Sequence, residues 1–125
     1  MQQANYVRLF ASPDGESHFE DLSIELAPVD FAPPAPPLNI AAFGPAVRTL
    51  WVGADAAWAG DVPHPSPRRQ VFCTVKGGYE VTASDGDVRS FPVGSVLLLE
   101  DTHGRGHATR VSEDALIFAV VVDPP

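Results

Sequence analysis

The stretch from Gln70 to Glu100, QVFCTVKGGYEVTASDGDVRSFPVGSVLLLE, decides the fold. Short apolar runs alternate in it with three strong turn signals, Lys76-Gly77-Gly78, Ser84-Asp85-Gly86-Asp87 and Pro92-Val93-Gly94. An Asp-Gly pair tolerates the positive φ angles of a tight hairpin turn, and glycine does so without steric cost. The strands expected between these turns are residues 70–75, 79–83, 88–91 and 95–100. Short strands at such spacing indicate a β-sandwich or a β-barrel.

Outside this stretch the pattern is also that of an all-β chain. Leu22, Ile24 and Leu26 alternate with polar residues, which is the periodicity of a strand. Further strands are expected at residues 5–10, 18–26, 47–52, 107–111 and 115–122, and residues 53–69 are expected to form a loop. No part of the chain has a convincing helical period.

The segment from Pro28 to Pro37 contains five prolines. Proline has no backbone N–H and a fixed φ angle, so this segment is expected to be an extended arm and not a strand within a hydrogen-bonded ladder. Two interpretations stay open. The arm is either a surface linker or a segment that lies across the barrel or across a partner subunit.

Composition and charge exclude several classes of protein. The chain has 125 residues, of which 45% are apolar and 19% charged, as expected of one folded domain. Its net charge of −8 argues against nucleic acids and anionic membranes as partners. No apolar run approaches the ~18 residues that span a bilayer. With one cysteine, Cys73, and no pattern of a signal peptide at the N-terminus, the expected compartment is the cytoplasm.

The apolar pattern of two strands predicts a covered outer face. Residues 115–122 are apolar on both faces of the expected strand. If Gln70 faces inward, Phe72 does so too, and the apolar side chains of the alternate positions face outward. Those outward positions are Val71, Cys73 and Val75. Either a second subunit or the N-terminal segments must cover them, and a homodimer is the expected assembly.

Two groups of residues are spaced like a known signature. The first group consists of Gly60, His64, Gln70 and Gly77, and the second of Gly86, Pro92, Gly94 and His107. This spacing resembles the two-part motif of the cupin superfamily. The resemblance implies a cupin-type double-stranded β-helix, a jelly-roll barrel. One domain over residues 1–125 is then expected, with N-terminal strands and the proline-rich arm in 1–44 and the barrel core in 45–122.

The cupin resemblance also implies a metal site, and here the chain departs from the family. Typical cupins hold a divalent metal with three histidines and one glutamate, whereas Ser66 takes the place of one histidine and Gln70 that of the glutamate. One alternative is a weakened site for iron, manganese, nickel or zinc. Its ligands would be His64, Gln70, His107 and His103.

The other alternative is a site without metal. Histidine titrates near neutral pH, so His64 or His107 is a candidate general acid or base. Gln70 would polarise a substrate carbonyl. Glu100 would be a base if burial raised its pKa, or would simply bond backbone N–H groups.

Four further residues are candidates for substrate binding. Phe72 and Leu98 are expected to form apolar walls of a cavity inside the barrel, as is usual for small-molecule sites. Arg68 could hold a substrate carboxylate through its two-pronged guanidinium, or form a salt bridge with one of the surplus acids. His18 shares the parity of the apolar positions in its strand, and is either part of the cavity or an ordinary interior histidine.

These residues lead to three hypotheses. The first is an enzyme for a small molecule, with isomerase, cyclase or lyase chemistry carried by His64, Gln70, His107 and Glu100. The second is a metal-dependent cupin oxygenase. The third is a binding protein without catalysis. The fold alone does not decide among them.

Overall fold

The computed structural model describes residues 2–122, and in this range the chain is all-β, as predicted, with twelve strands and no helix. The described residues therefore contain no helix that could span a membrane. In chain order the strands are β1 (Gln3–Ala11), β2 (Ser17–Glu25), β3 (Ala27–Val29), β4 (Leu38–Ile40), β5 (Ala46–Ala54), β6 (Ala59–His64), β7 (Gln70–Lys76), β8 (Gly78–Ala83), β9 (Val88–Pro92), β10 (Val96–Glu100), β11 (His107–Arg110) and β12 (Ala115–Val122).

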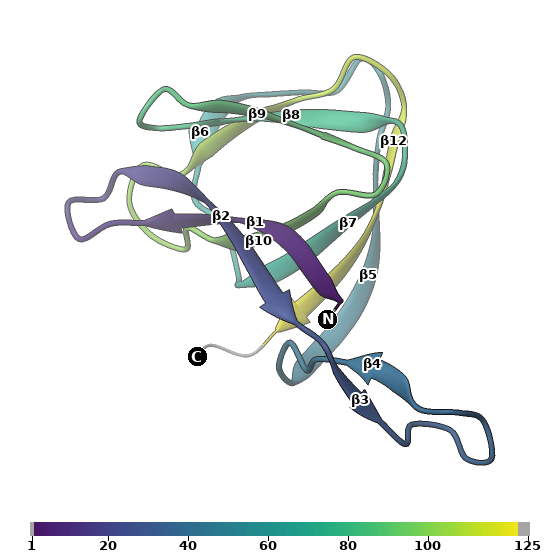
Figure 1. Cartoon of the computed structure of the whole chain (residues 1–125). Coiled ribbons are helices and arrows are strands. Elements are labelled where there is room, and N and C mark those ends of the chain that lie inside the picture. The colour runs from purple at the N-terminus through teal and green to yellow at the C-terminus, as the bar shows by residue number, and fades with distance from the viewer. Residues whose placement is uncertain (1, 123–125) are drawn as a thin grey trace.

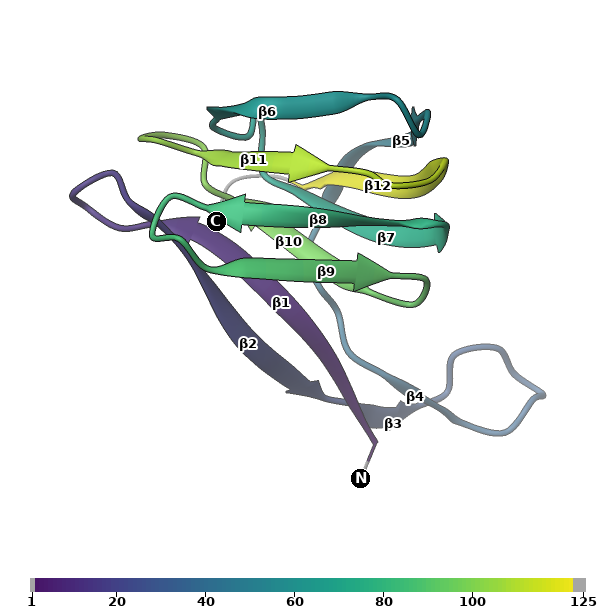
Figure 2. The same ribbon diagram turned by 90° about the horizontal axis from the view of Figure 1, so that it is seen from above.

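Ten of these strands form two sheets that face each other (Figure 1). The larger sheet has the order β2-β1-β10-β7-β12-β5, and the smaller has the order β6-β11-β8-β9. Within residues 2–122 no ladder of backbone hydrogen bonds joins one sheet to the other, so the two sheets are not closed into a barrel. Figure 2 shows β1 and β2 crossing the direction of the smaller sheet at an angle.

The core lies between the sheets and consists of alternate residues of their strands. Leu97 and Leu99 of β10 lie opposite Phe72 and Gln70 of β7, so these four side chains share the inner face. Leu98 points the other way and packs on the outer face with Val71 and Val122. The prediction that Leu98 lines the interior is therefore wrong, because side chains alternate along a strand and the register makes the odd-numbered residues of β10 face inward.

One of the ten strands in the two facing sheets was not expected from the sequence. Residues 59–64, predicted to be part of a loop, form β6 at the edge of the smaller sheet. Its sequence contains Pro63, and an edge strand accepts proline because the missing N–H can face away from the ladder. The pairing of β6 with β11 places His64 opposite His107.

Most of the proline-rich segment lies outside any ladder, as predicted, because residues 30–37 are the loop of a hairpin; only Pro28 and Val29 belong to a strand. β3 and β4 pair with each other, with Pro28 opposite Asn39. The hairpin projects away from the two sheets (Figures 1 and 2). Phe31 and Leu38 on it are largely exposed.

The outer face of the larger sheet is covered in part by the chain itself. Tyr6 of β1 packs edge-on against Phe43, which lies between β4 and β5, with ring centroids 5.3 Å apart. Trp51 packs against Phe118 but is 64% exposed. The N-terminal half thus supplies some of the expected cover, and the expected homodimer stays a prediction.

Candidate functional site

A cavity of about 230 Å³ lies between the sheets. Most of its wall is apolar and comes from the inner faces of both sheets, with Phe72, Leu97, Leu99 and Ile117 among its residues. Its polar wall residues include His64, Ser66, Gln70 and His107. An apolar cavity with a few polar groups is the usual form of a small-molecule site.

His107 is the first residue of β11 and is held by a buried carboxylate. The residue is 6% exposed, and its Nδ1–H donates to Asp101 Oδ2 at 2.5 Å. Asp101 follows β10 directly and is fully buried. Its second oxygen accepts a hydrogen bond from Ser66 Oγ at 2.7 Å. A carboxylate oxygen that accepts from Nδ1–H fixes the tautomer of the neutral imidazole, in which the lone pair lies on Nε2.

His64 lies across the ladder from His107 and has the same hydrogen-bond pattern. The ring centroids are 5.3 Å apart, and the planes are tilted by 50°. His64 Nδ1 lies 2.9 Å from the carbonyl oxygen of Pro65 and donates to it. Since a carbonyl only accepts, Nε2 of His64 also carries the lone pair. This histidine is exposed, which places it at the mouth of the cavity.

The close approach of the two histidine-bearing segments requires glycine at position 106. Gly106 has a φ angle of +71°, and a Cβ atom there would lie 2.0 Å from the carbonyl carbon of His64. Ser17 Oγ donates to the carbonyl oxygen of Gly106 at 2.7 Å and accepts from the N–H of Ser84 at 2.7 Å. The fully buried Ser17, at the start of β2, thereby supports the turn that precedes His107.

Gln70 and Phe72 lie on the inner face of β7 and line the same cavity. The Gln70 side chain is buried. Its amide can donate to a substrate oxygen or accept from a substrate hydroxyl. The structure therefore brings the predicted cluster of His64, Gln70 and His107 together around one cavity.

Glu100 does not belong to this cavity. Its carboxylate lies on the outer face of the larger sheet and accepts from Arg8 Nε and Arg69 Nε, each at 2.5 Å. Burial alone would raise the pKa of Glu100, but hydrogen bonds and charges from both arginines outweigh it and hold the pKa below its ordinary value. The hypothesis that Glu100 is a base with a raised pKa is wrong.

Three other predicted site residues also lie outside the cavity. Arg68 and His103 are exposed and line a groove on the outer face of the larger sheet. His18 on β2 bonds to Ser12 and Asp85 at the hairpin turns. None of the three is part of the wall around His107.

The donor set in the cavity does not fit the metal of a typical cupin. His64, His107 and the neutral amide of Gln70 offer two imidazole nitrogens and one uncharged oxygen, without the carboxylate that the family uses. Among residues 2–122 no group of three or more His, Cys, Asp and Glu side chains could hold a metal ion. His103 was expected as a fourth ligand, but the structure does not bring it to the other three.

Asp101 is the site residue that the sequence reasoning missed. The signal was present in the run Val96-Leu97-Leu98-Leu99-Glu100-Asp101. If Leu97 and Leu99 face inward, Asp101 continues the same parity. Ser66 was regarded only as a lost ligand, whereas it bonds the carboxylate that holds His107.

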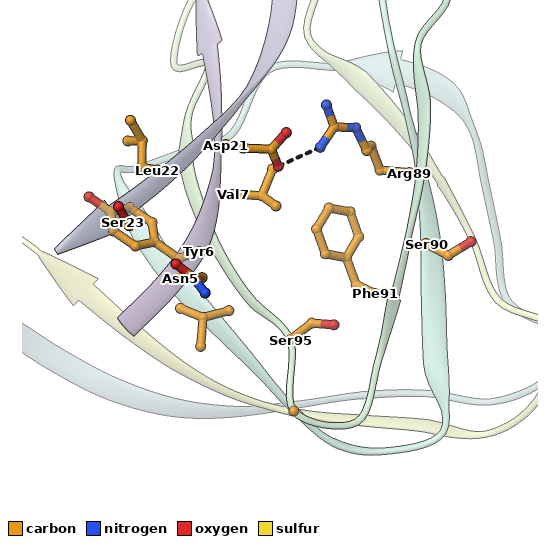
Figure 3. A pocket seen from close by; sticks show the side chains of 12 residues that line it. Asn5, Tyr6, Val7, Asp21, Leu22, Ser23, Arg89, Ser90, Phe91 and Ser95 are labelled. Atoms are coloured by element: carbon orange, nitrogen blue, oxygen red, sulfur yellow. Dashed lines mark hydrogen bonds and ion pairs between the residues drawn. The ribbon is translucent and has the colours of Figure 1, made fainter. Parts of the chain in front are cut away.

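A second hollow is larger and chemically different (Figure 3). It measures about 470 Å³ and lies where the edge strands β2 and β9 of the two sheets face each other. Asp21 and Arg89 form an ion pair of 2.8 Å across it, and Phe91 lies beneath. Its lining contains no histidine and no cysteine. The smaller cavity is therefore the better candidate for proton transfer.

No protein-family model matches this chain, and no curated protein matches it well enough to count as a relative. The resemblance to cupins accordingly depends on the motif residues themselves.

Proposed function

We propose that this chain is a cupin-type jelly-roll enzyme that transfers protons on a small carbonyl compound bound in the cavity. The reaction would be of the isomerase, cyclase or lyase type. The observation that carries the proposal is the buried Asp101–His107 pair, which leaves a basic nitrogen at an apolar cavity wall. Positioned acid–base groups are sufficient for this chemistry.

His107, Asp101, Gln70 and His64 each have a role in the proposed reaction. His107 Nε2 takes a proton from the carbon next to the carbonyl group, and Asp101 stabilises the resulting imidazolium. The electron pair of the broken C–H bond moves onto the carbonyl oxygen, which receives a hydrogen bond from the Gln70 amide. In a substrate with a C=C bond next to that carbon, the electron pair then flows back from the oxygen through the conjugated bonds. His107 or His64 delivers a proton to the far end of the conjugated system, so the double bond moves by one position, and the proton held on the imidazolium can exchange with solvent before it is delivered.

The cavity limits the size and polarity of the substrate. Its volume of about 230 Å³ lies below the ~300–1,000 Å³ of sites for drug-sized ligands. The aliphatic and aromatic wall excludes water and favours an uncharged body. We therefore expect a small ketone or aldehyde without an ionised group at the buried end.

The experiment is catalysed exchange of the substrate's α-protons in D2O, followed by ¹H NMR on a panel of small cyclic and acyclic ketones. The His107→Ala and Asp101→Asn variants should exchange the responding ketone at least ~100-fold more slowly than wild type. His18→Ala is the matched control, because it removes a histidine of another histidine–aspartate pair that lies outside the cavity. Unchanged exchange in a folded His64→Ala/His107→Ala variant would refute the proposal.

A binding protein without catalysis is the second candidate, favoured by the largely apolar wall of the cavity. It predicts that a ketone from the panel raises the melting temperature without exchanging its protons. Exchange that depends on His107 would exclude it.

A further inference from the structure

A groove of about 470 Å³ lies on the outer face of the larger sheet, next to the loops at 65–69 and 101–106. It lies outside the cavity of the proposed reaction, although Pro67 borders both. Its lining includes Arg8, Phe10, Arg68, Arg69, Glu100 and His103. The cavity mechanism uses none of these six residues.

The groove concentrates positive charge in an acidic chain. The chain has eight Lys and Arg residues and a net charge of −8, and three of those eight line this one groove. Two of the three are partly neutralised, because Arg8 and Arg69 share the carboxylate of Glu100 and Arg8 also bonds Glu20. Arg68 is exposed, and its side chain makes no hydrogen bond or ion pair with any residue from 2 to 122.

The chemistry of the groove suits an oxyanion attached to an apolar body. The carboxylate of Glu100 already lies between two guanidinium groups, so one oxyanion is accommodated there. A guanidinium matches the geometry of a carboxylate or phosphate with two parallel N–H donors. Phe10 lies under the Arg8 guanidinium at 4.3 Å, and Val122 adds an apolar surface.

We propose that this groove binds a small organic anion. Arg68 binds its carboxylate or phosphate group, and Phe10 and Val122 contact its apolar part. Glu100 competes with that anion for Arg8 and Arg69. The site stands independently of the reaction in the cavity, so it can exist in an enzyme or in a binding protein.

The test is an NMR titration of ¹⁵N-labelled protein with inorganic phosphate, phenyl phosphate and benzoate. We expect saturable shifts of the amide signals at residues 68, 69 and 103, tighter binding of phenyl phosphate than of inorganic phosphate, and weaker binding at high salt. Arg68→Ala should weaken binding about tenfold, the effect of losing one charge-assisted hydrogen bond. Arg110→Ala is the matched control, because it removes an exposed arginine of the other sheet and the same charge.

A second variant changes affinity in the opposite direction. Glu100→Gln keeps a hydrogen-bond acceptor and removes the competing charge, so phenyl phosphate should bind several-fold more tightly. The proposal is overturned if Arg68→Ala and Arg110→Ala weaken binding equally, if the shifts centre on His64 and His107, or if none of the three anions saturates. A melting curve for each variant shows that the fold is retained.

Discussion

Two histidines of this chain each donate Nδ1–H to an aspartate, but in opposite environments. The His107–Asp101 pair is buried between the sheets, with Asp101 0% and His107 6% exposed. The His18–Asp85 pair lies at the hairpin turns, 3.0 Å long and with side chains about a third exposed. Water competes for the second pair and not for the first, so the same chemical pair has different consequences.

The exposed pair also has a third member that makes it look catalytic. His18 Nε2 lies 2.8 Å from Ser12 Oγ, which gives the order of a Ser-His-Asp triad. However, the single hydroxyl proton of Ser12 is donated to Asp14 Oδ1 at 2.5 Å, and this bond lowers the pKa of Asp14. Both ring nitrogens of His18 are thus engaged, Nδ1 with Asp85 and Nε2 with Ser12, and His18 is not part of the wall around His107. What distinguishes His107 is its place in the cavity wall, with Nδ1 bonded to Asp101 and no hydrogen bond to Nε2 from residues 2–122.

The largest expected effect comes from removing each aspartate in turn. Asp101→Ala leaves the buried His107 and Ser66 side chains without their partner and should lower the free energy of unfolding by about 3 kcal/mol. Asp85→Ala should lower it by no more than about 0.5 kcal/mol, since an exposed pair contributes little. Urea unfolding followed by circular dichroism measures both. Equal losses in the two variants would show that burial does not separate the pairs.

A smaller effect is expected from the backbone next to His107. Gly106→Ala forces a Cβ atom against His64 and should lower the free energy of unfolding by about 2 kcal/mol or more. Gly86→Ala is the control, because Gly86 also has a positive φ angle, +93°, but no other atom lies within 4 Å of the added Cβ. It should lose only about 1 kcal/mol. A loss in Gly106→Ala no greater than in Gly86→Ala would contradict the proposed crowding at His64.

The smallest effect concerns Glu100. Its side chain is 15% exposed, more than the buried His107–Asp101 pair and less than the His18–Asp85 pair. Its pKa is lower in the folded chain than its ordinary value of 4.5, so its ion pairs stabilise the fold above that pH. This contribution, about 1 kcal/mol, should be lost as the pH falls through the folded pKa. Unfolding of wild type and Glu100→Gln at several pH values from 7 to 2 measures it. A difference that does not shrink as the pH falls below 4.5 would contradict the assignment.

Much of the fold could be predicted because its signals are local. The alternation of apolar residues and the turns at Gly77, Gly86 and Gly94 depend on neighbours in the chain, and the strands lie where these signals place them. β6 could not be predicted in this way, because its residues have no clear alternation and its order comes from pairing with β11.

The candidate site could be predicted only in part. The spacing of the motif located His64, Gln70 and His107, and these three do share one cavity. The motif spacing did not indicate Asp101 as a site residue. Glu100 and His103 were also candidates for the site, but both face outward. A strand shows two faces, and which one is buried depends on the strands packed against it.

The sequence by itself determined that the chain is all-β, where its hairpins turn and which residues are candidates for chemistry. Only the tertiary structure decided which histidine keeps a free nitrogen at a cavity. That outcome depends on the register of β6 against β11, on the room left by Gly106 and on a carboxylate buried behind His107. Register and burial arise from contacts between different strands, and residue type and spacing along one strand do not specify them.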